Sequence, residues 1–194
     1  MIHSWGMRIL FALAVMVGPA ATSVFASTCA EVPDYSDELS ALFEEARAAE
    51  TYQEGRTLSG RMWEVWLRAP DEAAQAVLDR GLSRRDSYDY VNAYADFTRL
   101  IEYCPDYAEG WNQRAFISFL RDDLDQALVD LDKALALQPR HVAAQAGRGL
   151  TLLKLGRIDE ARTQMLAAVA NNPWLNERAL LEKGAPLGPK GEDI

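Results

Sequence analysis

Apolar and small residues recur along the chain with helical spacing, and from residue 74 onward the pattern returns every 34 residues. The residue sets that repeat at this step are Gly81, Ala115 and Gly149; Ala93, Ala127 and Ala161; Phe97, Leu131 and Met165; and Pro105, Pro139 and Pro173. A period of this length is typical of helix pairs that bury their apolar faces by stacking. Small residues let helices approach closely, and each proline ends the second helix of a pair. The pattern therefore predicts an all-α solenoid of antiparallel helix pairs.

The copy at residues 108–141 resembles the tetratricopeptide repeat (TPR). The positions of that family's pattern are occupied by Trp111, Ala115, Leu124, Ala127, Leu131, Ala134 and Pro139. Copy 142–175 keeps the pattern with Gln145 in the aromatic position. Copy 74–107 is a weaker match, with Val77 in the aromatic position and Leu100 in a small-residue position. The resemblance implies three clear repeats that wind into a right-handed superhelix.

The segments on either side of the three repeats carry weaker patterns. Residues 36–73 contain two helical stripes that align with the first clear repeat if one residue is inserted. We expect them to form a degenerate helix pair at the start of the stack, preceded by an irregular segment at 27–35. Residues 176–183 suggest a C-terminal capping helix, and the Gly- and Pro-rich stretch 184–194 suggests a disordered tail.

The first residues, 1–26, have the features of a secretory signal peptide. Arg8 precedes the apolar run Ile9–Val17, and the sequence up to Ala26 fits a cleavage site, so we expect cleavage there. An uncleaved anchor is the alternative, but the run is far shorter than the roughly 18 to 20 apolar residues that span a bilayer. A lipoprotein anchored at Cys29 fits poorly, because Thr28 stands where a smaller residue is expected. The expected location is secreted, in the bacterial periplasm.

Two cysteines, Cys29 and Cys104, remain after signal removal. In an oxidising compartment an even pair favours a disulfide, which would tie the N-terminal segment to a turn between helix pairs. Two unpaired thiols, one of them buried, are the alternative. Neither cysteine has the C-x-x-C spacing of a redox enzyme.

The charge of the chain limits its partners. The formal net charge is −9, and the loss of Arg8 with the signal would make it −10. An acidic chain repels the phosphates of nucleic acids and of anionic lipids. We therefore expect no nucleic-acid partner and no stable membrane insertion after cleavage.

Candidate chemistry is sparse in this sequence. His141 is the only histidine after residue 26, and we expect it to be a solvated residue in the turn after Pro139. Neither a histidine metal site nor a Ser/His/Asp triad has its remaining parts. Asp122, Asp123 and Asp125 lack the Gly and distal Glu of a calcium loop, so helix caps and a solvated face are the better interpretation. We expect no catalytic residues, no metal and no cofactor.

The remaining candidate is a binding surface. In TPR arrays the first helix of each pair lines a concave groove, and the resemblance places there Glu109, Asn112, Phe116, Phe119 and Leu120, with Leu82, Arg85, Leu150, Leu153 and Lys154 from the neighbouring repeats. These residues are more apolar than charged, which suits a bound peptide or helix. Too few basic and Asn residues are present to expect the carboxylate-gripping subtype of the family. For Phe116 and Leu150, packing in the core is favoured over a place in the groove.

Three functional classes follow from these features. We expect a non-enzymatic protein-interaction module of the cell envelope, which binds a peptide or partner protein in its groove as a scaffold or assembly factor. A permanent accessory subunit of an envelope or cytochrome maturation complex is the alternative. An enzyme would require a pocket with convergent ionisable groups, which the sequence does not indicate.

Overall fold

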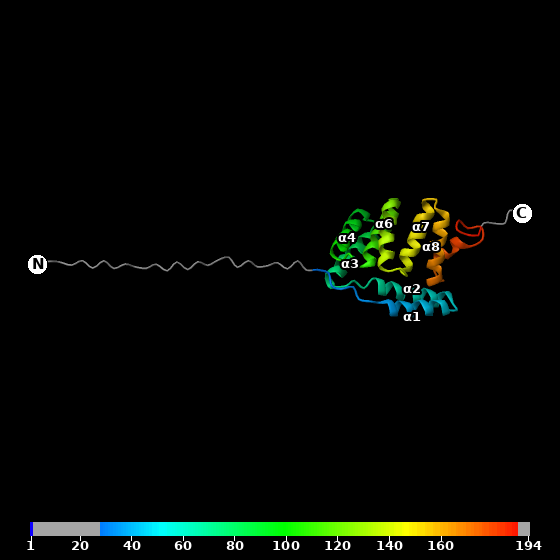
Figure 1. Cartoon of the computed structure of the whole chain (residues 1–194), viewed down its shortest axis with the longest axis horizontal. Helices are drawn as coiled ribbons and strands as arrows, with labels where there is room; N and C mark the ends of the chain where they lie inside the picture. Colours follow the sequence, from blue (N-terminus) through cyan, green and yellow to red (C-terminus); the bar gives the residue numbers. More distant parts are fainter. Residues whose placement is uncertain (2–27, 190–194) are drawn as a thin grey trace.

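The computed structural model describes Met1 and residues 28–189. Within that part, the chain forms eight α-helices followed by one 3₁₀ helix (Figure 1). The helices are α1 (Ser36–Ala48), α2 (Tyr52–Trp66), α3 (Glu72–Asp86), α4 (Tyr90–Tyr103), α5 (Ala108–Leu120), α6 (Leu124–Leu137), α7 (Val142–Lys154), α8 (Ile158–Asn171) and the 3₁₀ helix η1 (Asn176–Leu181). Among them, no helix is long and apolar enough to cross a bilayer.

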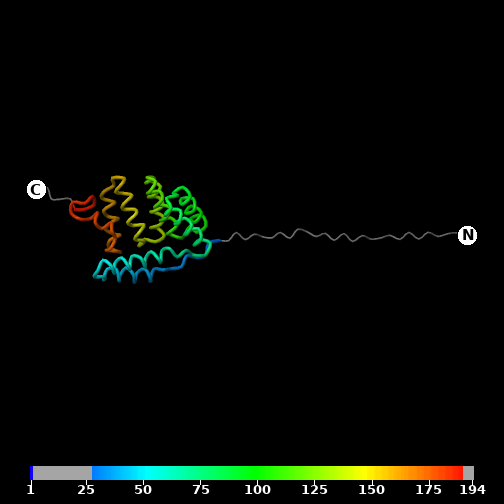
Figure 2. The backbone as a smooth tube through the Cα atoms, turned by 180° about the vertical axis from the view of Figure 1, so that it is seen from behind, coloured from blue at the N-terminus to red at the C-terminus, as the bar shows by residue number. Residues whose placement is uncertain are grey.

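Helices α3 to α8 form three hairpins that stack side by side (Figures 1 and 2). Within a hairpin, the small residue of the first helix seats a large residue of the second. A Cβ added to Gly81 would lie 2.5 Å from the Phe97 ring, and one added to Gly149 would lie 3.0 Å from the Met165 methyl group. Phe97 and Met165 are fully buried. The predicted α-solenoid of helix pairs is confirmed, and the close packing explains why small residues recur at this position.

The turn inside each stacked hairpin is the same structure. Tyr88, Asp122 and Gly156 lie 34 residues apart and have positive φ angles of 63°, 63° and 74°. The backbone N–H of each of these three residues donates to a carbonyl of the helix that precedes it. The N–H of the following residue also donates to a carbonyl of that helix, as in a Schellman motif. Only one of the three repeats places glycine at this strained position.

Residues 36–73 contain the expected helix pair, but the α1–α2 pair does not begin the stack. These two helices pack on each other, but α2 does not stack on α3 as α4 stacks on α5. The pair instead runs across the stacked hairpins, beneath the turns that join one repeat to the next (Figure 1). We refer to it as the crossing hairpin.

The crossing hairpin contacts three successive inter-repeat turns. The Tyr107 hydroxyl donates to the Trp66 carbonyl at 2.6 Å. The His141 ring stacks on the Trp66 ring with centroids 4.4 Å apart. The Trp174 indole N–H donates to the Ala46 carbonyl at 2.8 Å. The buried cluster of the hairpin also takes in Val142 of α7, so the hairpin packs directly on the third repeat.

Charged side chains on α3 explain why the crossing hairpin does not stack there. In the second repeat, Arg114 and Ser118 of α5 have little exposed surface, and Arg114 reaches Thr98 of α4. The corresponding residues of α3 are Arg80 and Arg84. A helix stacked on α3 would have to bury both guanidinium groups without added anions, which is costly.

The N-terminal segment at 28–35 is fixed to the repeats. Cys29 and Cys104 form a disulfide with their Cα atoms 5.2 Å apart. Next to it, the Ala30 N–H and the Tyr103 hydroxyl both donate to the Asp71 carboxylate, at 3.0 and 3.1 Å. The predicted signal peptide lies outside the described residues.

The C-terminal segment is more ordered than the sequence suggested. In place of a capping α-helix, residues 176–181 form the 3₁₀ helix η1. Residues 184–189 are not a disordered tail, because Leu187 is fully buried against α8 and the Gly188 carbonyl accepts a hydrogen bond from Arg162 at 2.9 Å. Residues 190–194 lie outside the described part.

Candidate functional site

A groove of about 650 Å³ lies between the repeats and the crossing hairpin. One wall is formed by the first helices of the three repeats, α3, α5 and α7, and the other by α2 of the crossing hairpin. Residues 172–177 contribute to the lining as well. The groove is therefore bounded by two walls from distant parts of the chain.

Both walls carry aromatic side chains. Trp63 and Trp66 come from α2 and contact each other edge to face, with ring centroids 5.6 Å apart. Phe116 and Phe119 come from α5 on the opposite wall. Trp63 is 37% exposed and Phe116 is 44% exposed, so both present apolar surface to an occupant. Aromatic residues accessible in a concave site are typical of peptide and ligand recognition.

The structure brings part of the predicted groove set together. The predicted residues that line the groove are Arg85, Asn112, Phe116, Phe119 and Leu150. The predicted residues outside its lining are Leu82, Glu109, Leu120, Leu153 and Lys154. Lys154 lies at the edge of α7, where it bonds Asp122 at 2.6 Å. The core position favoured for Phe116 is wrong, because 44% of its surface is exposed.

Sequence reasoning missed the entire second wall. The groove residues contributed by α2 are Arg56, Ser59, Gly60, Trp63 and Trp66. The 34-residue period could not reveal them, because α2 lies outside the stack. The one available signal was the amphipathic pattern of α2, in which Trp63 lies off the buried face of Met62, Val65 and Trp66.

A buried network of polar side chains lies beside the groove. The Glu109 carboxylate accepts hydrogen bonds from Asn112 at 3.1 Å and from Gln113 at 2.5 Å, and it contacts His141 Nε2 at 2.7 Å. All four side chains are nearly inaccessible to solvent. Arg85 extends the network into the groove by donating to Gln113 at 2.9 Å. The network therefore holds Arg85 and Asn112 of the groove in fixed positions.

The prediction that His141 is a solvated turn residue is wrong. His141 Nδ1 accepts the Ala144 N–H at 3.3 Å, so Nε2 is the nitrogen that carries a proton toward Glu109. With both ring nitrogens bonded and one ring face on Trp66, the histidine joins α5, α7 and the crossing hairpin. Its role is structural.

The groove offers donors and apolar surface rather than reactive groups. The indole N–H of Trp66 is buried and has no acceptor within residues 28–189. Elsewhere, the sulfur atoms of Cys29 and Cys104 lie near Asp71, but the disulfide removes the thiolates that a metal would need. The arrangement is suited to binding.

Comparison with known proteins agrees with this architecture. Residues 118–175 match the family model described as Tetratricopeptide repeat. The chain contains tetratricopeptide repeats. That TPR match spans part of the second repeat and all of the third.

Curated relatives are also TPR proteins. A tetratricopeptide repeat protein 36 homolog of Nematostella vectensis is 39% identical over 67 residues, which cover 34% of this chain and 37% of that protein. Tetratricopeptide repeat protein 36 of Bos taurus is 32% identical over 123 residues, which cover 61% and 65%. A TPR repeat-containing protein of Rhizobium etli is 36% identical over 52 residues, covering 27% and 26%. The chain thus spans between 26% and 65% of the length of these relatives.

Solved TPR structures share the fold. The TPR domain of Arabidopsis OM64 superimposes with a TM-score of 0.56 at 23% identity, covering 58% of this chain and 93% of that one. The first TPR domain of Spaghetti (RPAP3), bound to the HSP90 peptide SRMEEVD, gives 0.53 at 21% identity, covering 55% and 84%. At these identities the likeness establishes the fold alone.

Proposed function

We propose that the groove binds a short extended segment of a partner protein, and that the chain is a non-enzymatic scaffold or assembly factor of the bacterial cell envelope. The observation that carries the proposal is the aromatic lining on two facing walls, with Trp63 on one and Phe116 on the other. A bulky apolar side chain of the segment inserts between these rings. Its backbone carbonyls accept hydrogen bonds from Asn112 and Arg85 of the lining.

The size of the groove supports a short segment. A volume of about 650 Å³ lies within the range of roughly 300 to 1,000 Å³ that is usual for ligand pockets. A helix is about 10 to 12 Å across with its side chains, so several turns of helix would not fit between the two walls. Permanent subunit interfaces bury roughly 2,000 Å² or more. The groove is therefore better suited to reversible capture of a segment than to a permanent accessory subunit.

The similarity to TPR domains supports a peptide as the occupant, because one solved neighbour is described with an HSP90 peptide bound. The chemistry of that peptide does not transfer, since its sequence is acidic and this groove is mainly apolar.

Binding to an array of short peptides tests the proposal. We expect the protein to bind peptides that contain an aromatic or large aliphatic residue. We expect Phe116→Glu to lower the affinity for these peptides by at least about tenfold. Leu166→Glu is the matched control, because Leu166 is 50% exposed on α8 and does not line the groove. Equal affinity of the Phe116→Glu protein and the unchanged protein would exclude the groove as the binding site.

The location is tested separately. Expression of the full chain in a bacterium, followed by fractionation, is expected to place the mature protein in the periplasm with Ser27 as its first residue. A cytoplasmic protein that retains Met1 would contradict the envelope assignment and leave the peptide-binding proposal intact.

A further inference from the structure

Three arginines converge on one buried carboxylate at the α3–α4 end of the stack. Asp96 of α4 is fully buried, and it accepts hydrogen bonds from Arg80 at 3.0 Å, Arg84 at 2.5 Å and Arg99 at 2.9 Å. The three arginine side chains are 45%, 34% and 61% exposed. We refer to Arg80, Arg84 and Arg99 as the arginine cluster. It has two positive charges more than its single carboxylate neutralises.

The repeat itself requires only one of these arginines. Arg80–Asp96 recurs 34 residues later as Arg114–Asp130, where one arginine bonds the acid at 2.8 and 2.7 Å through two nitrogens. The positions that correspond to Arg84 hold Ser118 and Leu152 in the other repeats, and those that correspond to Arg99 hold Lys133 and Ala167. Because the second repeat satisfies its buried acid with one arginine and the neutral Gln126, which donates at 3.0 Å, the charges of Arg84 and Arg99 are additional to what the packing needs.

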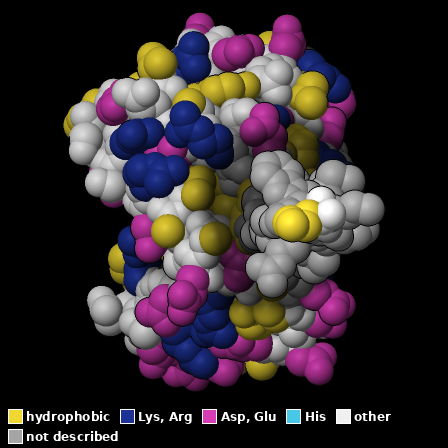
Figure 3. Space-filling view, turned by 90° about the vertical axis from the view of Figure 1, so that its left-hand side faces the viewer, with side chains coloured by type: hydrophobic (Ala, Val, Ile, Leu, Met, Phe, Trp, Pro, Cys, Tyr) yellow, Lys and Arg dark blue, Asp and Glu magenta, His cyan; other side chains and the backbone are white. Residues whose placement is uncertain are grey.

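The cluster is accessible because the crossing hairpin does not stack on α3. In a regular array the preceding repeat would cover this end face. Figure 3 views that end of the molecule and shows Lys and Arg side chains gathered around an acidic one. On a chain with a formal net charge of −9, this is a local positive patch on an acidic molecule.

The guanidinium groups are arranged to take a further anion. Each carries five N–H donors, and within residues 28–189 only one nitrogen of each makes a hydrogen bond. The remaining donors are available for bidentate contacts with carboxylates. Because Asp96 already holds the three side chains in place, binding costs less conformational entropy than it would for freely rotating arginines.

We propose that the arginine cluster is a second binding surface, which takes a short acidic segment of a partner protein through its Asp or Glu side chains. The charge distribution favours a short segment over a membrane. An anionic bilayer would also face the acidic remainder of the molecule, whereas a short peptide interacts mainly with charges inside a Debye length of about 8 to 10 Å. The surface is distinct from the groove, so it does not depend on the function proposed above.

The test uses the full chain and a fluorescein-labelled hexaglutamate peptide with blocked ends, with hexaglutamine as the uncharged comparison. We expect binding of hexaglutamate at low salt that weakens steeply as salt is added. The double variant Arg84→Gln/Arg99→Gln is expected to weaken it at least about tenfold, since two charged contacts are lost. Arg80 remains to pair Asp96. If the double variant does not fold by circular dichroism, Arg99→Gln alone is measured, because Arg99 is the most exposed of the three.

The matched control is Arg61→Gln/Arg68→Gln, which removes the same charge from exposed arginines that pair with Glu45 and Glu38. We expect a change of less than about twofold from this control, because the two arginines lie outside the cluster. The Arg84→Lys/Arg99→Lys variant keeps the charge and loses the forked geometry, so it is expected to bind with intermediate affinity.

Several outcomes would overturn the proposal. They are equal binding of hexaglutamate and hexaglutamine, an equal loss in the control variant, or binding to phosphatidylglycerol vesicles through Arg84 and Arg99 in the absence of hexaglutamate binding. Phe116→Glu separates the two proposals. Hexaglutamate binding that survives this substitution supports a separate surface, and hexaglutamate binding lost with it would assign the peptide to the groove.

Discussion

The three stacked repeats and the crossing hairpin are both built from antiparallel helices, but they are held by different kinds of contact. In the stack, the same interactions recur at a fixed step, such as the small residue at Gly81 or Gly149 facing a large one. The crossing hairpin is held by single contacts that occur once, chiefly those of Trp66 and Trp174 with the inter-repeat turns. Regular packing therefore forms the scaffold, and irregular packing adds the second wall of the groove.

Sequence separation shows what this difference means. The Arg114–Asp130 contact of the stack joins residues 16 apart. The Tyr107–Trp66 bond joins residues 41 apart, and the Trp174–Ala46 bond joins residues 128 apart. Short-range contacts form with little loss of chain entropy, whereas distant ones require an ordered partner. We therefore expect the stack to form without the hairpin, and the hairpin to depend on the stack.

The largest expected effect comes from breaking the stack at its buried ion pair. Asp130 is fully buried and Arg114 is 14% exposed, so Asp130→Ala leaves a positive charge with little water and no anion. We expect a loss of about 3 to 5 kcal/mol in the free energy of unfolding, measured by urea denaturation. We expect the three repeats to unfold in a single transition, because the second repeat lies between the other two and contacts both.

The third repeat supplies the matched control. Its Gln164 occupies the position that corresponds to Asp130, and it bonds Arg148 at 3.3 Å without a charge of its own. We expect Gln164→Ala to cost less than about 1 kcal/mol, as for a partly exposed neutral hydrogen bond. Equal costs at the two positions would show that the buried charge is not what stabilises the second repeat.

The next effect in size comes from removing the aromatic contact between hairpin and stack. Trp66 is 5% exposed and contacts both His141 and Tyr107. We expect Trp66→Ala to weaken docking of the crossing hairpin by about 3 kcal/mol. Hydrogen exchange is the measurement. Amides of α1 and α2 should lose protection while those of α5 to α8 keep it.

Trp63→Ala is the comparison variant, because Trp63 lies on the same helix but faces the groove and is 37% exposed. We expect little change in protection and, if the proposed function holds, weaker peptide binding. Uniform loss of protection across all helices in Trp66→Ala would contradict the independence of the stack.

The stack could be predicted from the sequence because residues that pack in the same way recur at the same positions of each repeat. Four sets of residues at one step predict the hairpins and the close approach of their helices. The same reasoning failed for residues 36–73, whose helices have the right length and stripe. What decides their place is Arg80 and Arg84, which make the end of α3 unsuitable for stacking. A repeat pattern in the sequence predicts that a helix pair forms. Where that pair packs depends on the surface offered by the neighbouring repeat.

The site was predicted in part for the same reason. Arg85, Asn112 and Phe116 follow from their repeat positions, whereas the α2 wall does not. His141 had no partner in its sequence neighbourhood, because Glu109 precedes it by 32 residues and Trp66 by 75. A lone histidine in a turn gives no sequence signal for burial when its contacts belong to another supersecondary unit.

A smaller effect is expected where the N-terminal segment meets the stack. Asp71 caps α3 by accepting the Ala74 N–H at 2.8 Å, and it also accepts the Ala30 N–H at 3.0 Å. Asp71→Ala is expected to cost about 1 to 2 kcal/mol, as for loss of a helix N-cap. Urea denaturation at neutral pH measures the difference.

The pH dependence gives a second measurement for Asp71. The backbone N–H groups of Ala74 and Ala30 hold its pKa below the ordinary value of 3.8. A lowered folded-state pKa means that the stabilisation is complete above pH 3.8 and is lost as the pH falls through the folded-state value. The difference in the free energy of unfolding between the unchanged protein and Asp71→Ala should therefore become smaller only in acid below pH 3.8. If this difference in stability becomes smaller between neutral pH and mild acid, the stabilisation comes from another titratable group.

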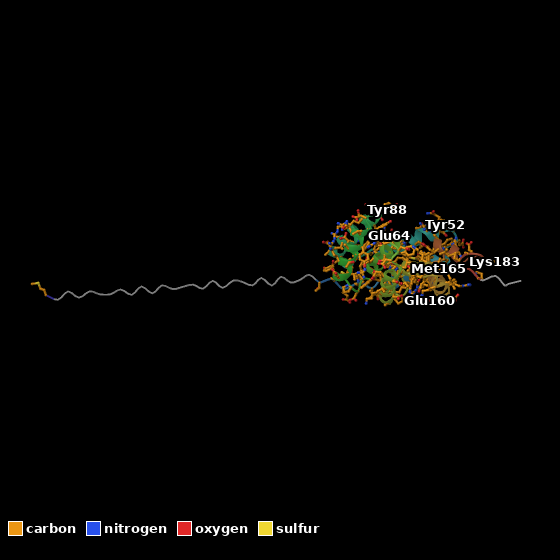
Figure 4. The ribbon with its side chains drawn as sticks, turned by 90° about the horizontal axis from the view of Figure 1, so that it is seen from above. Tyr52, Glu64, Tyr88, Glu160, Met165 and Lys183 are labelled. Atoms are coloured by element: carbon orange, nitrogen blue, oxygen red, sulfur yellow. A yellow bond between two sulfur atoms is a disulfide. The ribbon has the colours of Figure 1, made fainter. Side chains whose placement is uncertain are left out.

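The smallest expected effect is a gain in stability at the turn of the first repeat. Tyr88 has a φ of 63°, which costs a residue with a Cβ about 1 kcal/mol, whereas glycine adopts it freely. Tyr88 is 80% exposed at the surface of the molecule (Figure 4), and its edge contact with Tyr90 has ring centroids 6.1 Å apart, so little packing is lost on truncation. We expect Tyr88→Gly to raise the free energy of unfolding by about 0.5 kcal/mol, after the greater freedom of glycine in the unfolded chain is subtracted. Gly156→Ala at the corresponding position of the third repeat should lower it by about 1 kcal/mol, because the added Cβ strains the same backbone conformation. Both changes are measured by thermal and urea unfolding. If the two substitutions change the stability in opposite directions, the two turns have the same backbone conformation. Changes in the same direction would contradict this.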